Sequence, residues 1–159
     1  MRKIFILFAA LLCLQIAASA QNPEFEYVME IKAVCDPSYT VGQTAHGERA
    51  IIPIVGGTFE GPRLKGTVIP GGADYQLIDK VKGRTELEAI YSIRTDDGIN
   101  IHVRNVGLSV MNKDGFYFRT APKFEAPSDS RYDWLNNAIF VCVPEGKPDY
   151  ISLKIYMVK

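Results

Sequence analysis

Alternation of apolar and polar side chains is the feature that most constrains how this chain can fold. Between Phe25 and Cys35, every second residue up to Ala33 is apolar, and charged side chains lie in between. The segment from Tyr150 to Val158 repeats the pattern with Ile, Leu, Ile and Met. A period of two is typical of a strand with one buried face. Because helical periodicity is almost absent, the sequence predicts an all-β fold with little or no helix.

Turn signals divide the alternating sequence into short segments. The step Asp96-Asp97-Gly98 is the strongest hairpin signal, and only residues 132–137 favour a helical turn. We expect strands at residues 25–35, 50–55, 58–59, 64–69, 75–78, 86–95, 99–106, 108–111, 116–120, 136–143 and 150–158. These roughly ten short strands predict a single antiparallel β-barrel, closed or nearly closed, because an open sheet would expose two long edges.

A glycine-rich run from Gly47 to Asp74 interrupts this regular pattern. It holds six glycines where a strand would favour side chains, namely Gly56, Gly57, Gly61, Gly66, Gly71 and Gly72. Such glycines indicate bulges, tight corners or close approach of two backbones. Lone charged residues, including Arg49 and Glu60, lie among them. The run therefore predicts irregular strands that carry a polar site.

The first twenty residues have the features of a secretory signal peptide. Arg2 and Lys3 precede an apolar stretch, and the small residues Ala18-Ser19-Ala20 form a cleavage site before Gln21. A membrane anchor is the alternative, but an apolar segment that ends at Ala20 is short for a span and no basic cluster follows it. We therefore expect a signal peptide at 1–20, one domain at 21–159, export to the periplasm or the medium, and no membrane span after cleavage.

Charge and cysteine content limit the classes of partner and cofactor. Without Arg2 and Lys3, the 18 basic residues fall to 16 against 18 acidic ones, and no basic cluster remains, which argues against nucleic-acid binding. Cys35 and Cys142 remain after cleavage, and an oxidising compartment permits a disulfide between them, with two free buried thiols as the alternative. These two cysteines and the two histidines are too few for a zinc site, so no metal or other cofactor is expected.

Several motifs recur along the chain in an order that one family shares. They are Gly42, Gly47 and Arg49; Gly56 to Pro62; Leu64 to Gly66; Pro70 to Asp74; Tyr91; Arg94 to Gly98; Asn105 and Gly107; Tyr117 to Arg119; Pro122, Phe124 and Glu125; and Tyr132, Trp134, Leu135 and Asn136. On these residues the chain resembles the domain of unknown function 3237 family, an uncharacterised bacterial and fungal group. The resemblance covers nearly all of residues 21–159 and implies a single-domain β-barrel without settled biochemistry.

Carboxylates and arginines in these distinctive segments are candidates for chemistry. Glu60 and Asp74 are the candidate catalytic acid and base, because different surroundings can move the pKa values of two carboxyl groups apart. Candidate ligand-binding residues are Arg49, Arg94, Asp97, Arg119, Phe124, Glu125 and Trp134. An arginine can hold an anionic group in a bidentate manner. The structural alternative is that Asp97 shapes a turn and that arginine–carboxylate pairs hold loops together.

Aromatic residues gather in the late part of the chain. Trp134, Tyr132, Phe124 and Tyr117 are expected either to plug one end of the barrel or to line the floor of an apolar pocket.

Three hypotheses for function follow. The first is a barrel that binds a small molecule at one mouth, and the second is an acid–base enzyme of the isomerase, lyase or hydratase type. The third is a structural or interaction barrel whose interior is filled. Fold resemblance does not choose among them, and an open barrel edge would permit a homo-oligomer. Both site hypotheses expect Glu60 and Asp74 to face a common cavity.

Overall fold

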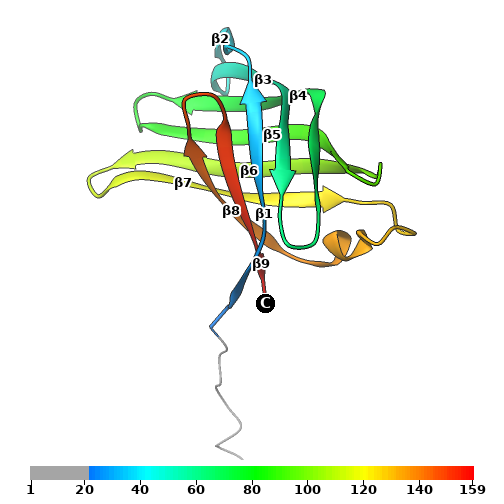
Figure 1. Cartoon of the computed structure of the whole chain (residues 1–159). Coiled ribbons are helices and arrows are strands. Elements are labelled where there is room, and N and C mark those ends of the chain that lie inside the picture. The colour runs from blue at the N-terminus through cyan, green and yellow to red at the C-terminus, as the bar shows by residue number, and fades with distance from the viewer. Residues whose placement is uncertain (1–21) are drawn as a thin grey trace, which may run out of the picture.

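The computed structural model describes residues 22–159, and the predicted signal peptide lies outside this range. These residues form nine strands and one short 3-10 helix (Figure 1). The elements are β1 Phe25–Cys35, β2 Tyr39–Thr44, β3 Gly47–Glu60, β4 Lys65–Asp79, β5 Arg84–Thr95, β6 Asn100–Asn112, β7 Gly115–Glu125, η1 Asp133–Asn137, β8 Phe140–Gly146 and β9 Ile151–Val158.

The strands close into a barrel. Their order is β1-β9-β8-β7-β6-β5-β4-β3-β2, and β1 also pairs with β3, so eight strands form a complete ring. All of these pairings are antiparallel. β2 pairs with β3 alone and extends the sheet beyond the ring. The predicted antiparallel barrel is therefore confirmed, with one extra strand.

Bulges make the strands fewer and longer than predicted. Segments expected to be separate join into β3, β4 and β6, and β2 was not predicted at all. The register shifts between Ile54 and Thr58, and again between Ile69 and Ala73. Positive φ angles at Gly56, Gly57 and Gly71 accompany these shifts. The glycines thus bend the strands without ending them, because a bulge interrupts a ladder locally while pairing resumes beyond it.

A bulge also divides the faces of β1. The register with β9 shifts between Tyr27 and Met29. Phe25 and Tyr27 are 57% and 41% exposed, whereas Met29 and Ile31 are buried in the barrel. The prediction that all these apolar residues share one face is therefore wrong at the start of the strand. The predicted inward face of β9 is confirmed, since it buries Leu153 and Ile155.

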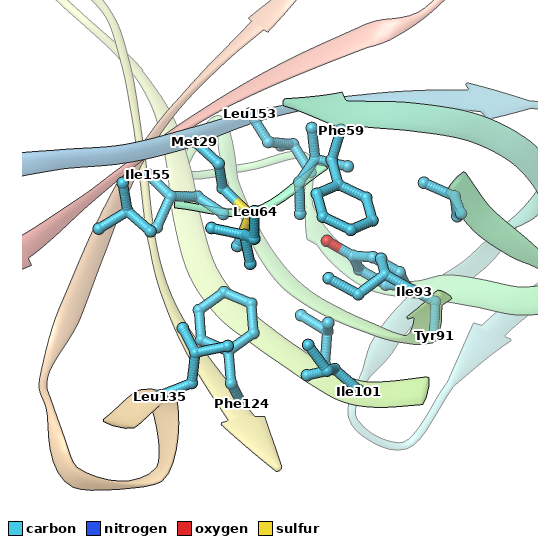
Figure 2. Close-up of a cluster of buried hydrophobic side chains, with 14 of the residues drawn as sticks. Met29, Phe59, Leu64, Tyr91, Ile93, Ile101, Phe124, Leu135, Leu153 and Ile155 are labelled. Carbon is cyan, nitrogen blue, oxygen red and sulfur yellow. The ribbon is translucent and has the colours of Figure 1, made fainter. Parts of the chain in front are cut away.

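Apolar side chains fill one half of the barrel interior, which we call the packed half. Figure 2 shows Phe124, Leu135 and Ile101 facing Met29, Leu64 and Phe59 across it. This half lies at the end where β5 turns into β6 and where η1 covers the opening (Figure 1). The helical turn predicted at residues 132–137 is confirmed as η1.

The two cysteines do not form the disulfide considered above. Both Cys35 and Cys142 have free thiols. Burial raises the pKa of each thiol, and that of Cys142 rises to about 12. Both side chains are therefore neutral at ordinary pH, as expected of thiols in an apolar interior.

Candidate functional site

The second half of the barrel interior holds a cavity of about 170 Å³, which we call the lumen pocket. Its walls are mainly apolar, and its lining residues are Ala33, Cys35, Ile52, Ile54, Asp74, Gln76, Leu87, Ala89, Tyr91, Asn105, Phe118, Thr120, Pro144, Ile151 and Leu153. Ile52, Gln76 and Phe118 are partly exposed, so the pocket reaches solvent at the end opposite η1. A cavity of about 150 Å³ can hold one benzene ring, so the lumen pocket has room for one ring.

The sheet register places the polar residues of the pocket on neighbouring strands. Asp74 on β4 pairs with Ala89 on β5, and Ala89 pairs with Asn105 on β6. The small side chain of Ala89 therefore separates the carboxyl group from the amide. Thr120 on β7 pairs with Gly107, two residues beyond Asn105 on the same face of the sheet. These three polar side chains lie along one wall of the pocket.

Four buried polar atoms of the described residues lack a hydrogen-bond partner, and all four belong to residues that line the lumen pocket. They are Asp74 Oδ1, Tyr91 OH, Asn105 Oδ1 and Thr120 Oγ1. Tyr91, Asn105 and Thr120 are only 3%, 3% and 7% exposed. Figure 2 shows the Tyr91 hydroxyl pointing toward the packed half, so this residue lies at the border between the two halves. Each unpaired buried polar group costs about 1–3 kcal/mol, which a structural role does not explain.

Asp74 has the electrostatic setting of an acid–base group. Burial raises the pKa of its carboxyl group. A side-chain hydrogen bond from Gln76 and a backbone hydrogen bond from Glu88 act in the opposite direction. The Gln76 amide donates to Oδ2 at 2.8 Å, which fixes the carboxyl group and leaves Oδ1 free. Burial therefore favours a protonated carboxyl group that presents one oxygen to the pocket.

Among the described residues that line the lumen pocket, none is lysine, arginine or histidine. A ligand carboxylate or phosphate there would be buried without a cation and close to Asp74. Such burial is strongly unfavourable. The pocket therefore suits an uncharged molecule.

Two glycines make room for pocket residues. A Cβ on Gly72 would lie 2.4 Å from Cβ of Tyr91, and one on Gly107 would lie 2.3 Å from Cγ2 of Thr120. Any side chain at these two positions would displace the neighbouring strand. The predicted close approach of backbones is confirmed at Gly72, where it lets Tyr91 pack into the wall of the pocket.

The structure does not bring Glu60 and Asp74 together, so the expectation that they face a common cavity is wrong. Glu60 is exposed on the outer face of β3, in a surface depression that Lys65 and Asp96 also line. Arg49 lies on the outer face beside Tyr75. Arg119 is outside as well, where its Nη1 donates to the Phe118 carbonyl at 2.6 Å. Of the predicted catalytic and ligand-binding residues, only Asp74 lines the lumen pocket.

The remaining predicted residues lie at or near the packed end. Asp97 accepts hydrogen bonds from Thr95 at 2.5 Å and from Tyr132 at 2.8 Å, and Arg131 pairs with it at 3.1 Å. The Arg63 guanidinium lies 3.7 Å from the centre of the Trp134 ring.

Phe124 is buried against Phe140, whereas Arg94 and Glu125 are exposed, and Nε of Arg94 donates to Asn100 at 2.8 Å. Tyr132, Trp134 and Phe124 thus form the plug that was one of the two expectations, whereas Tyr117 lies on the outside.

Sequence reasoning overlooked Gln76, Tyr91, Asn105 and Thr120 as site residues. A signal was nonetheless present in β6, where Asn105 follows Ile101 and Val103 at alternate positions on the buried face. A polar residue in an apolar register of this kind is rarely buried unless it has a partner.

The described residues offer neither a cluster of metal ligands nor a long apolar helix. No group of three or more His, Cys, Asp or Glu residues among them is placed to hold a metal ion. None of the helices formed by residues 22–159 is both long and apolar enough to cross a bilayer.

Comparisons with known proteins place the chain in a family. A UPF0311 protein of Clostridium acetobutylicum is 35% identical over 149 residues, covering 84% of this chain and 93% of that protein. The solved structure of a β-barrel-like protein from Acinetobacter baumannii has a TM-score of 0.82 at 29% identity, covering 89% of this chain and 99% of the other.

A fungal protein is a more distant relative. The hydroalkoxylation enzyme phnH of Penicillium herquei is 29% identical over 121 residues, covering 72% of this chain and 70% of the enzyme. The solved structure of an enzyme from the same fungus has a TM-score of 0.72 at 25% identity, covering 90% and 99% of the two chains. The sequence model of the family called protein of unknown function (DUF3237) matches residues 23–158. The chain therefore belongs to the DUF3237 family, as its motifs suggested.

Proposed function

We propose that the lumen pocket binds a small, uncharged organic molecule with a hydroxyl group on a ring. We further propose that the Asp74 carboxyl group donates a proton to this molecule and takes one back from it. The observation that carries this proposal is the set of unpartnered polar atoms on one wall of an apolar cavity. A ligand hydroxyl can donate to Asn105 Oδ1 and accept from the Thr120 hydroxyl. The apolar walls then bury the ring.

The fungal relative suggests the class of reaction. Hydroalkoxylation adds a hydroxyl group across a carbon–carbon double bond, and it needs a proton donor and a proton acceptor but no co-reactant. The protonated Asp74 carboxyl group donates its proton to one alkene carbon, and the hydroxyl oxygen bonds to the other. The hydroxyl proton then returns to the carboxylate. Substrate and product are isomers, and the carboxyl group is restored.

Ortho-prenylphenol is a suitable probe, because it is uncharged and carries both the hydroxyl group and the alkene. We expect the protein to convert it to the cyclic ether. The ether has the same mass as the probe, and chromatography separates the two. Asp74→Asn removes the transferable proton while keeping the side-chain shape. It should lower the rate by about a hundredfold or more, since general acid–base groups contribute about 10²–10⁴-fold.

Glu60→Gln is the matched control, because it removes a carboxylate on the outside of the barrel and should leave the rate unchanged. An Asp74→Asn variant that is folded and fully active would contradict the role of Asp74. Binding of the probe by calorimetry without any conversion would support the pocket and overturn the proton transfer.

Export is a separate part of the proposal, supported by the leader sequence at residues 1–20. Amino-terminal sequencing of the native protein should begin at Gln21. A protein recovered with Met1 in place would contradict cleavage.

A further inference from the structure

The ladder between β7 and β8 is nearly absent. Within the described residues these two strands share one pair, Thr120 with Cys142. On its other side, β7 is paired with β6 along its whole length, from Gly115 to Glu125. The ring of the barrel therefore has one weak seam.

Two prolines explain why the seam is weak. Continuing the register on the same face would join Pro122 to Phe140 on one side of the Thr120–Cys142 pair, and Phe118 to Pro144 on the other. A proline nitrogen has no hydrogen to donate, so proline is normally confined to edges of sheets. Both rungs that flank the remaining pair thus contain a residue that cannot donate.

A groove of about 660 Å³ lies over this seam on the outer face of the barrel. Its lining is mainly apolar and includes Phe25, Leu108, Tyr117, Val141, Val143 and Tyr156. Arg119 is its one charged residue, and its guanidinium lies 5.5 Å from the centre of the Tyr117 ring. A depression with so little charge suits an apolar occupant.

The groove and the lumen pocket meet at Thr120, which lines both. Gly107 and Cys142 beside it also line the groove, and Gly107 adds no side chain to the wall. On the solvent side of the Thr120–Cys142 pair, Phe118 and Pro144 line the pocket, whereas Tyr117 and Val143 line the groove. The lumen pocket and the groove therefore lie on the inner and outer sides of the same seam, with Thr120 in the wall between them.

We infer that the seam between β7 and β8 is a lateral opening of the lumen pocket, and that the groove holds the apolar chain of a ligand whose hydroxylated ring lies beside Asp74. This inference rests on the binding pocket proposed above and narrows its ligand to an amphiphile. The shared residue Thr120 is the reason to assign the groove to the same ligand. The polar head meets the unpartnered atoms inside, and the chain meets apolar side chains outside.

A series of para-alkylphenols, from para-methylphenol to para-heptylphenol, tests the inference by calorimetry. Each methylene buried in the groove should tighten binding roughly fourfold. Val143→Trp fills the groove from outside the barrel. It should leave the affinity for para-methylphenol unchanged and abolish the gain with chain length.

Val55→Trp is the matched control, because Val55 is an exposed valine on β3 that does not line the groove. It should preserve the full chain-length series. Ala121→Trp is a second variant that fills the groove, and melting curves show which variants are folded. A folded groove variant that keeps the chain-length gain would overturn the lateral opening.

The unaltered protein separates the two proposals. Binding of para-methylphenol without any gain along the series would overturn the groove assignment alone. Failure of every alkylphenol to bind would overturn the lumen pocket as well.

Discussion

The packed half and the pocket half of this barrel are built from the same alternating strands, but they differ in whether their buried polar groups are paired. In the packed half, the polar groups around η1 have partners: Tyr132 donates to Asp97, and Asn136 exchanges hydrogen bonds with the backbone of Ala126, whereas the unpaired Tyr91 hydroxyl lies at the border between the halves. In the pocket half, Asp74, Asn105 and Thr120 each leave a buried oxygen unpaired. The contrast teaches that stability is concentrated at one end, while the other end keeps unsatisfied polar groups for a ligand.

Matched phenylalanines give the largest expected difference between the halves. Phe124 is fully buried against Phe140, so Phe124→Ala should lower the free energy of unfolding by about 3–5 kcal/mol. Phe118 lines the pocket and is partly exposed, so Phe118→Ala should lose less than half as much. Urea unfolding followed by circular dichroism measures both. Equal losses would show that the two halves are packed alike.

Two aspartates should give the halves opposite pH dependence. The pKa of Asp74 is raised by burial, so below its unfolded value of about 3.8 the carboxyl group is neutral in both states. As pH rises through the unfolded and folded pKa values, the folded protein must ionise a buried group and loses stability. Asp74→Asn should therefore gain stability relative to the unaltered protein as pH rises through this window.

Asp97 should behave in the reverse way. Hydrogen bonds from Thr95 and then Tyr132 lower the pKa of its carboxyl group. Its contribution is present above its unfolded pKa and is lost as pH falls through the folded value. Urea midpoints of Asp74→Asn and Asp97→Asn across this range test both statements. Parallel pH profiles in the two variants would refute the contrast.

Much of the fold was predictable from the sequence, because local patterns determine it. The bounds of β1 and the hairpin at Asp96-Asp97-Gly98 needed only alternation and turn chemistry. β2 escaped because Tyr39–Thr44 includes a glycine and has no alternating buried face. The merging of segments into β3 and β4 was hidden because glycine marks a bulge and a turn alike.

The site was less predictable, since it depends on which face each residue occupies. A register slip of one residue moves every side chain to the other face. A turn and the register shift of β4 between Ile69 and Ala73 lie between Glu60 and Asp74, so sequence spacing did not show that one faces out and the other in. The roles of Asn105 and Thr120 depend on pairing across β6 and β7, which the sequence does not specify.

The most direct test of the account is to remove one unpaired polar group and one paired group and to compare the results. Asn105→Leu replaces the unpartnered amide by an apolar side chain of similar size. It should raise the free energy of unfolding by about 1 kcal/mol and weaken binding of para-methylphenol. Tyr132→Phe, in the packed half, should lower the free energy of unfolding by about 1 kcal/mol and leave binding unchanged. An Asn105→Leu variant that is less stable yet binds para-methylphenol normally would contradict the account.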